Sequence, residues 1–137
     1  MAMPAKILIV DDHDIVREGI RTLIVRSQPE WKICGEASSG PQAIELVKAL
    51  KPDLVVLDIT MPQMSGLETA SQLAKLALGC RILIFTMHDS SRMPIEVRQA
   101  GAHGFVLKSQ ASRDLVRAMK LLLAGETFFG AEAPVLS

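Results

Sequence analysis

The sequence predicts an α/β protein with a doubly wound, five-stranded parallel sheet in the order 2-1-3-4-5. Short β-branched apolar runs alternate with amphipathic helical patterns along nearly the whole chain. The apolar runs are mostly continuous, which is typical of strands buried on both faces. Strands joined through helices run parallel with right-handed crossovers, and 2-1-3-4-5 is a common order for five of them.

Five apolar runs are each too short for a helix, and we predict them as strands. They span Lys6 to Val10, Trp31 to Glu36, Leu54 to Leu57, Arg81 to Phe85 and Gly104 to Leu107.

Helices are predicted between and after these strands because apolar residues recur with helical spacing and give each segment one apolar face. Pro41 after Ser39, and Ser65 before Glu68, indicate helix starts, whereas Gly79 and Gly125 indicate helix ends. The four apolar faces contain Val16, Ile20, Leu23 and Ile24; Ala43, Ile44, Val47 and Leu50; Leu67, Ala70, Ala74 and Ala77; and Leu115, Met119, Leu122 and Leu123.

The helix expected before the last strand contains a proline near its start. Pro94 lacks an N–H donor and disfavours helical backbone at Met93. We therefore expect this helix to begin late or to be loose in its first turn.

Length and composition favour one soluble domain. The chain has 137 residues, 49% of them hydrophobic and 22% charged, which excludes disordered and collagen-like classes. Its 15 basic and 15 acidic side chains give a net charge of zero, so nothing in the overall charge favours binding to nucleic acid. No apolar run is long enough for a membrane span, and we expect a cytoplasmic protein.

Cysteine and histidine spacing predicts no zinc or redox motif. Cys34 and Cys80 are far apart and are expected to be buried thiols. His13, His88 and His103 share no spacing typical of a metal site and are expected on the surface or in loops.

Polar residues follow four of the predicted strands, at the edge where doubly wound sheets bind ligands. They are Asp11, Asp12, Asp58, Thr86 and Lys108. Three converging carboxylates repel one another unless a divalent cation neutralises them, and hard oxygen ligands favour Mg²⁺. A carboxylate beside such a cation can act as a nucleophile toward a phosphoryl group, with the hydroxyl and amine as donors.

Taken singly, each of these residues has a structural explanation. Asp11 and Asp12 could cap a helix, Asp58 could be a loop residue, Lys108 a solvated charge and Thr86 an ordinary strand residue. Their joint placement at strand ends favours the phosphoryl-transfer site.

Four segments together resemble the receiver domain of bacterial response regulators, which has a flavodoxin-like, CheY-like fold. They are residues 7–13, 57–66 (with the sequence LDITMPQMSG), 85–86 and 101–108. The sequences of residues 85–89 and 123–126 are similar to those of the NarL/FixJ type. Members of that type usually carry a DNA-binding helix-turn-helix domain after the receiver, which we expect to be missing from this chain.

The resemblance implies that Asp58 accepts a phosphoryl group from a histidine kinase. It implies that Asp12, Asp58 and the backbone carbonyl of Thr60 bind Mg²⁺, for which Mn²⁺ could substitute, and that Asp11 acts partly through water. Such a protein catalyses only its own phosphotransfer and autodephosphorylation and is not otherwise an enzyme.

The resemblance also assigns switch and tuning residues. Lys108 corresponds to the phosphate-binding amine, Thr86 to the switch hydroxyl and Phe105 to the aromatic switch. Thr60 and His88 correspond to variable positions that tune the phosphorylation lifetime. The expected output is a change in the face formed by the fourth helix, the fifth strand and the last helix, with phosphorylation-dependent homodimerisation.

We expect residues 5–125 to form the receiver and residues 126–137 to begin a linker or C-terminal tail. Ser109 stands where many receivers have a cis proline, and we expect a trans bond there. Three alternatives remain: a stand-alone phosphotransfer receiver, a pseudo-receiver that serves only for binding, and a Mg²⁺-dependent phosphatase. The last usually has a second acid two residues after the nucleophile, where this chain has Thr60.

Overall fold

The apolar runs form a parallel sheet, described by a computed structural model that covers residues 4–129. The strands are β1 (Lys6–Val10), β2 (Lys32–Ala37), β3 (Leu54–Leu57), β4 (Arg81–Thr86), β5 (Gly104–Leu107) and β6 (Phe128–Phe129). Their order in the sheet is β2-β1-β3-β4-β5-β6, and all pairs are parallel. The predicted order of the first five strands is therefore confirmed.

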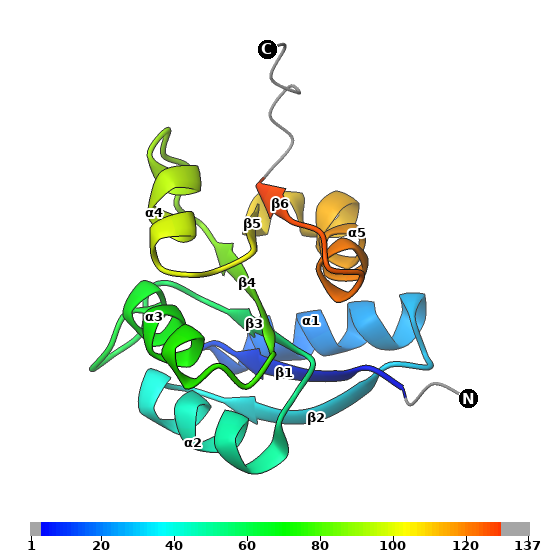
Figure 1. The fold of residues 1–137 in the computed structure, drawn as a ribbon. Helices are drawn as coiled ribbons and strands as arrows, with labels where there is room; N and C mark the ends of the chain where they lie inside the picture. The colour runs from blue at the N-terminus through cyan, green and yellow to red at the C-terminus, as the bar shows by residue number, and fades with distance from the viewer. Residues whose placement is uncertain (1–3, 130–137) are drawn as a thin grey trace.

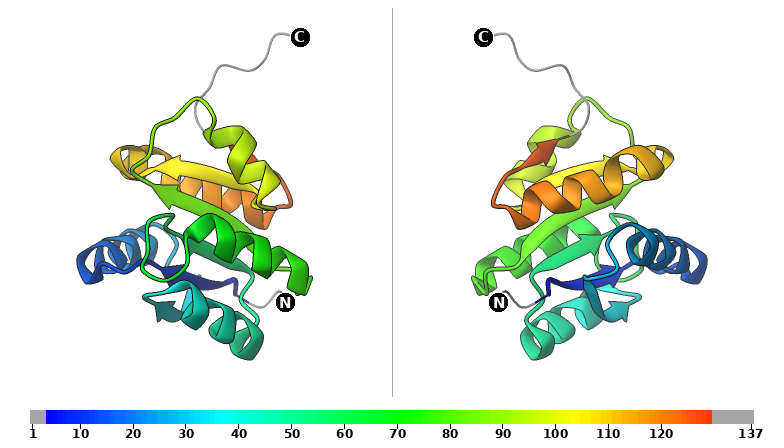
Figure 2. Two further views of the ribbon diagram at one scale, coloured as in Figure 1. Left: turned by 90° about the vertical axis from the view of Figure 1, so that its left-hand side faces the viewer. Right: turned by 90° about the vertical axis from the view of Figure 1, so that its right-hand side faces the viewer.

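Helices cover both faces of the sheet, which explains why the strands are continuously apolar. The helices are α1 (Asp14–Ser27), α2 (Gly40–Leu50), α3 (Gly66–Leu76), α4 (Met93–Gln99) and α5 (Ala111–Leu123), with a short 3-10 turn, η1 (Lys108–Gln110). Helices α1 and α5 pack on one face, and α2, α3 and α4 pack on the other (Figures 1 and 2).

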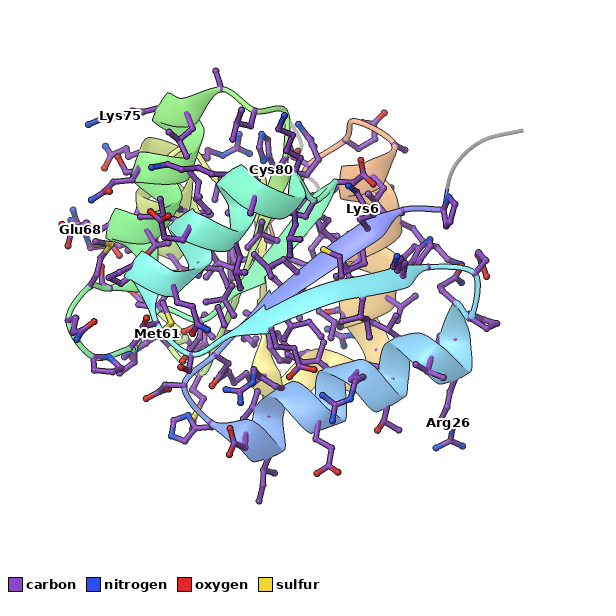
Figure 3. The ribbon with its side chains drawn as sticks, turned by 90° about the horizontal axis from the view of Figure 1, so that it is seen from below. Lys6, Arg26, Met61, Glu68, Lys75 and Cys80 are labelled. Carbon is purple, nitrogen blue, oxygen red and sulfur yellow. The ribbon has the colours of Figure 1, made fainter. Side chains whose placement is uncertain are left out.

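The strand register places the polar residues that follow β1 and β3 side by side at one edge of the sheet. Val10 lies beside Leu57, so the residues that follow them, Asp11 and Asp58, leave the sheet together. Met61, just beyond β3, lies at the opposite end of the sheet from Cys80, which precedes β4 (Figure 3). The end beyond β3 is the carboxyl rim, and the residues of the candidate site lie there.

The sixth strand was not predicted. Phe128 pairs with Gly104 and Phe129 with Phe105, which places β6 at the edge of the sheet beside β5. A Cβ atom at Gly104 would collide with the backbone carbonyl of Phe128, so only glycine permits this close approach. Residues 130–137 of the predicted linker lie outside the described part of the chain.

Two strands and the third helix differ in part from the prediction. β2 begins and ends one residue later than expected, and β4 extends to Thr86. On the predicted apolar face of the third helix, Ala70 is buried as expected, whereas Ala74 and Ala77 are exposed. The helix also buries Thr69 and Leu73. The helix ends at Leu76 with Ala77 in the left-handed conformation, so the predicted stop signal at Gly79 lies two residues too late.

The start of α4 also differs from the prediction. The helix begins at Met93, and the expectation of a late start is wrong. Pro94 occupies the first turn, where its missing N–H would have no acceptor within the helix. The helix has seven residues, and the side chain of Arg92 does not cap it.

The two cysteines differ in burial. Cys80 is buried as predicted, whereas Cys34 on β2 is only half-buried, because β2 is an edge strand of the sheet. Burial raises the pKa of both thiols. Within residues 4–129, the structure contains no helix with the length and apolar character of a membrane span.

Candidate functional site

An acidic cluster lies at the carboxyl rim, where β1 and β3 end. Atoms of Asp11, Asp12, His13 and Asp58 that could bind a metal all lie within 4.8 Å of one another. Asp11 is 1% exposed and Asp58 is 4% exposed, so both carboxyl groups are removed from bulk water. The structure thus brings together the three aspartates that the sequence singled out.

Lys108 links the carboxylates from the other side. It follows β5 directly, at the start of η1, and its Nζ donates a hydrogen bond to Asp11 Oδ2 at 2.9 Å. The same nitrogen lies 3.3 Å from Asp58 Oδ1. One amine therefore bridges two buried carboxylates that belong to neighbouring strands.

The electrostatic balance at Asp58 is unfavourable for its charged form. Burial, followed by the nearby Asp11 carboxylate, raises the pKa of the Asp58 carboxyl above its ordinary value, against the opposing attraction of Lys108. A bound cation would relieve this repulsion.

The oxygen atoms of the cluster fit a divalent cation. Asp12 Oδ1 is buried and has no hydrogen-bond partner among the described residues. His13 Nδ1 lies 3.0 Å from this oxygen, but its ring hydrogen bond is made with Asp11. A buried carboxylate oxygen without a donor, beside two further carboxylates, is the donor set that Mg²⁺ prefers.

The capping explanation for the aspartate pair is not supported. The N-cap of α1 is His13, and within the described chain this cap makes no side-chain hydrogen bond. Asp11 Oδ1 instead accepts the N–H of His13 at 2.9 Å. His13 is exposed and precedes α1, as expected for a surface or loop histidine, but it also belongs to the acidic cluster, which its sequence spacing did not indicate.

Thr86 lies buried at the end of β4, on the side of Asp58 away from β1. Its Oγ1 accepts the N–H of His88 at 3.0 Å, so the hydroxyl shapes the start of the β4–α4 loop. In this loop, His88 lies next to Thr60, and His88 Nε2 and Thr60 Oγ1 are hydrogen-bonded at 3.1 Å. Sequence reasoning named both residues but did not predict this contact.

Phe105 lies on β5 and is 8% exposed. Its ring packs against Phe129 of β6, with ring centroids 6.4 Å apart and planes inclined by 57°. The guanidinium of Arg98, on α4, lies 3.8 Å from the centre of the Phe129 ring. Phe105 is thus covered by a strand that the sequence analysis did not predict.

The loop after Asp58 is fixed by its backbone. The Gly66 N–H donates to the carbonyl of Ile59 at 2.7 Å. A Cβ atom at position 66 would collide with the backbone of Asp58, which explains the glycine at the end of the 57–66 motif.

Arg17 is a polar residue near the site that the sequence analysis missed. Its Nη1 donates to the backbone carbonyl of Asp11 at 2.6 Å, and its Nε donates to Glu36 Oε1 at 3.1 Å. From sequence alone, an arginine in the second turn of an amphipathic helix is normally expected to be a solvent-exposed charge. Only the fold shows that it reaches the β1–α1 loop.

Comparison with known proteins gives consistent results. Residues 7–120 match the response regulator receiver domain family. The nitrate/nitrite response regulator NarL of Escherichia coli K12 is 40% identical over 135 residues, covering 98% of this chain and 62% of NarL. The response regulator UvrY of the same strain is 33% identical over 126 residues, covering 92% of this chain and 57% of UvrY.

A solved structure shows the same fold at similar identity. It is a LuxR-family two-component response regulator from Aurantimonas sp. SI85-9A1, with a TM-score of 0.88 and 39% identity, covering 93% of this chain and 91% of that one. The chain spans less than two thirds of the length of the two curated relatives. Because the family model matches residues 7–120, the chain belongs to the response regulator receiver domain family.

Proposed function

We propose that this chain is a phosphorylation-activated receiver in which Asp58 accepts a phosphoryl group from a histidine kinase. The observation that carries the proposal is the convergence of buried Asp58 with Asp11, Asp12 and Lys108 at one rim of the sheet. Receivers are signalling domains, and the proposed catalysis is limited to the chain's own phosphotransfer and autodephosphorylation.

Mg²⁺ would be held by Asp12, Asp58 and the backbone carbonyl of Thr60, with Asp11 acting partly through water. The partnerless oxygen of Asp12 supports this ligand set. Mn²⁺ would substitute, because it also prefers carboxylate and carbonyl oxygen. When bound, the cation neutralises charge on the oxygens of the transferring phosphoryl group.

The chemical step is a displacement at phosphorus. An Asp58 carboxylate oxygen attacks the phosphorus of a phosphohistidine, the P–N bond breaks, and its electron pair stays on the imidazole nitrogen, which takes up a proton from water. The product is an acyl phosphate. Lys108 is already 3.3 Å from Asp58 Oδ1, so its ammonium is placed to pair with the new phosphoryl oxygens.

The proposed output lies on the face formed by α4, β5 and α5. A phosphoryl group adds about −1.5 to −2 charge at pH 7, and the Thr86 hydroxyl is the donor expected to move toward it. Phe105 then has to respond, because it lies on the strand beside Thr86. We propose that this change promotes association with a second copy or another partner.

The whole protein is proposed to regulate transcription. Its relatives are named as response regulators and are longer than this chain. Residues 5–125 would form the receiver and residues 126–137 would begin a linker to a DNA-binding domain, since nothing in the net charge suggests that the receiver itself binds nucleic acid. The phosphatase alternative is disfavoured, because the position of its second acid is held by Thr60, which is hydrogen-bonded to His88.

Intact-mass analysis tests the proposal. Incubation with Mg²⁺ and acetyl phosphate should add one phosphoryl group to the parent protein, and Asp58→Asn should abolish the addition. Asp53→Asn is the matched control, because Asp53 is an exposed aspartate at the other end of β3. Equal phosphorylation of the Asp58→Asn variant would refute the assignment of Asp58.

A further inference from the structure

Arg17 joins three parts of the chain at the edge of the acidic cluster. It lies on α1 with a side chain that is 15% exposed. Its guanidinium donates to the Asp11 carbonyl at 2.6 Å, to Glu36 of β2 at 3.1 Å and to Asp14. These contacts use the fixed fork of the guanidinium, which a lysine does not offer.

The contact with the Asp11 carbonyl fixes one peptide plane. The carbonyl of Asp11 and the N–H of Asp12 belong to the same planar unit. On the other side, the N–H of Asp11 donates to the carbonyl of Ala37 at 3.0 Å. With Asp11 held at both its N–H and its carbonyl, the direction in which the chain presents Asp12 is set.

Asp12 has no comparable support from its own side chain. Its Oδ1 makes no hydrogen bond within residues 4–129, and the following helix has no side-chain cap at His13. The Asp11 carboxylate is engaged elsewhere, with the His13 N–H and Lys108. His13 Nδ1 lies 3.0 Å from Asp12 Oδ1, but the His13 side chain is itself 66% exposed. The backbone anchor from Arg17 is therefore the contact from a largely buried side chain that holds the peptide leading into Asp12.

The charge of Arg17 does not itself act on the cluster as an isolated cation. Glu36 pairs with both Arg17 and Arg21, and Asp14 pairs with Arg17, so this group contains two positive and two negative charges. Removing either arginine changes the net charge by the same amount. The two differ in two contacts, because only Arg17 donates to the Asp11 carbonyl and only Arg17 pairs with the exposed Asp14.

We propose that Arg17 is a positioning residue for the divalent cation, acting through the peptide between Asp11 and Asp12. The inference rests on the proposed function, since it assumes that Asp12 binds Mg²⁺. Outer-shell partners of metal ligands typically change metal affinity by about 10- to 100-fold. Arg17 acts on a ligand through its backbone, and we expect an effect at the lower end of that range.

The test compares Arg17→Met with Arg21→Met by titration calorimetry with Mg²⁺. Positioning predicts an affinity about 10-fold weaker in Arg17→Met. It predicts an unchanged or slightly tighter affinity in Arg21→Met, because that variant loses a positive charge and a contact with Glu36 but keeps the hydrogen bond from Arg17 to the Asp11 carbonyl. Phosphorylation of Arg17→Met by acetyl phosphate should approach the parent rate at saturating Mg²⁺, because the defect lies in cation binding.

Equal Mg²⁺ affinity in the two variants would overturn the proposal, even if both unfold at lower temperature. If Arg17→Met does not fold, Arg17→Lys replaces it, because a lysine keeps the charge but cannot hold both Glu36 and the Asp11 carbonyl. Parent-like affinity in Arg17→Lys would then count against the proposal. A parent protein that neither binds Mg²⁺ nor becomes phosphorylated would instead refute the proposed function on which it rests.

Discussion

At the scale of single residues, the site is short of positive charge. Three aspartates meet one lysine, and the Asp58 carboxyl has a raised pKa because burial and Asp11 outweigh Lys108. A ligand that binds the native state but not the unfolded state stabilises the protein. A divalent cation at this rim would therefore stabilise the fold as well as serve the proposed chemistry.

A second residue with an unusual environment lies away from the site. His103, just before β5, accepts the N–H of Ile82 on its Nδ1 at 3.0 Å. Burial, followed by the charge of Arg81, lowers the pKa of His103 below its ordinary value. The neutral imidazole is thus part of the connection between β4 and the end of the α4–β5 loop.

This environment predicts a dependence of stability on pH. The unfolded chain binds a proton at His103 near pH 6.5, whereas the folded chain binds it only at lower pH, so the free energy of unfolding should fall as pH decreases below about 6.5. Above that pH, His103 should contribute no slope. Urea unfolding of the parent and of His103→Asn, which keeps an acceptor near Ile82 but does not titrate, measures the difference. Identical slopes below pH 6.5 would show that His103 is not responsible.

Individual residues were predictable where the topology alone places them. Asp11, Asp58 and Lys108 each follow a strand and Thr86 ends one, so strand order and polarity suffice to bring them to one rim. The role of Arg17 was not predictable, because no sequence motif marks its position on α1. Its contact with the Asp11 carbonyl depends on the direction in which its side chain turns from the helix, which only the structure shows.

At the scale of elements, the strong patterns were predicted and the short or irregular segments were not. β6 has two residues, too few to show a periodicity, and its place depends on the room that Gly104 leaves beside β5. The end of α3 was missed because Ala77 adopts a left-handed conformation that glycine usually takes. Pro94 was read as an obstacle to α4, although a first turn tolerates proline.

A hydrogen bond between side chains joins the loops that follow β3 and β4. Thr60 comes from the β3–α3 loop and His88 from the β4–α4 loop, and their hydrogen bond measures 3.1 Å. Both residues are exposed, so the contact is open to solvent. The two positions proposed to tune the lifetime of the phosphoryl group are therefore physically coupled.

The coupling predicts non-additive effects on autodephosphorylation. A net hydrogen bond contributes about 0.5–1.5 kcal/mol, so Thr60→Ala and His88→Ala should each change the decay rate by about 2- to 10-fold. The double variant should resemble either single variant, because both remove the same contact. Decay of the phosphorylated mass over time gives the four rates, with Mg²⁺ affinity as the control that should stay nearly constant. Strictly additive effects would contradict the coupling.

At the scale of the whole molecule, the rim and the α4–β5–α5 face meet at β4 and β5. Thr86 ends β4 beside β5, and Phe105 lies two residues earlier along β5 than the partner of Thr86. A cavity of about 410 Å³ between α4 and α5 borders Phe105 and Phe129. A movement of Thr86 would therefore act on the neighbouring strand β5, where Phe105 borders this cavity.

This arrangement predicts that activation reaches the edge of the sheet. Beryllium fluoride at Asp58 should draw Thr86 inward and change the packing of Phe105 against Phe129, whose ring also contacts Arg98. Backbone NMR shifts should therefore extend through α4, β5 and β6, and sedimentation should show association. The change should be partial, because one or two charge-assisted hydrogen bonds supply only a few kcal/mol. Shifts confined to the rim, or a Thr86→Ala variant that responds like the parent, would show that the two regions are not coupled.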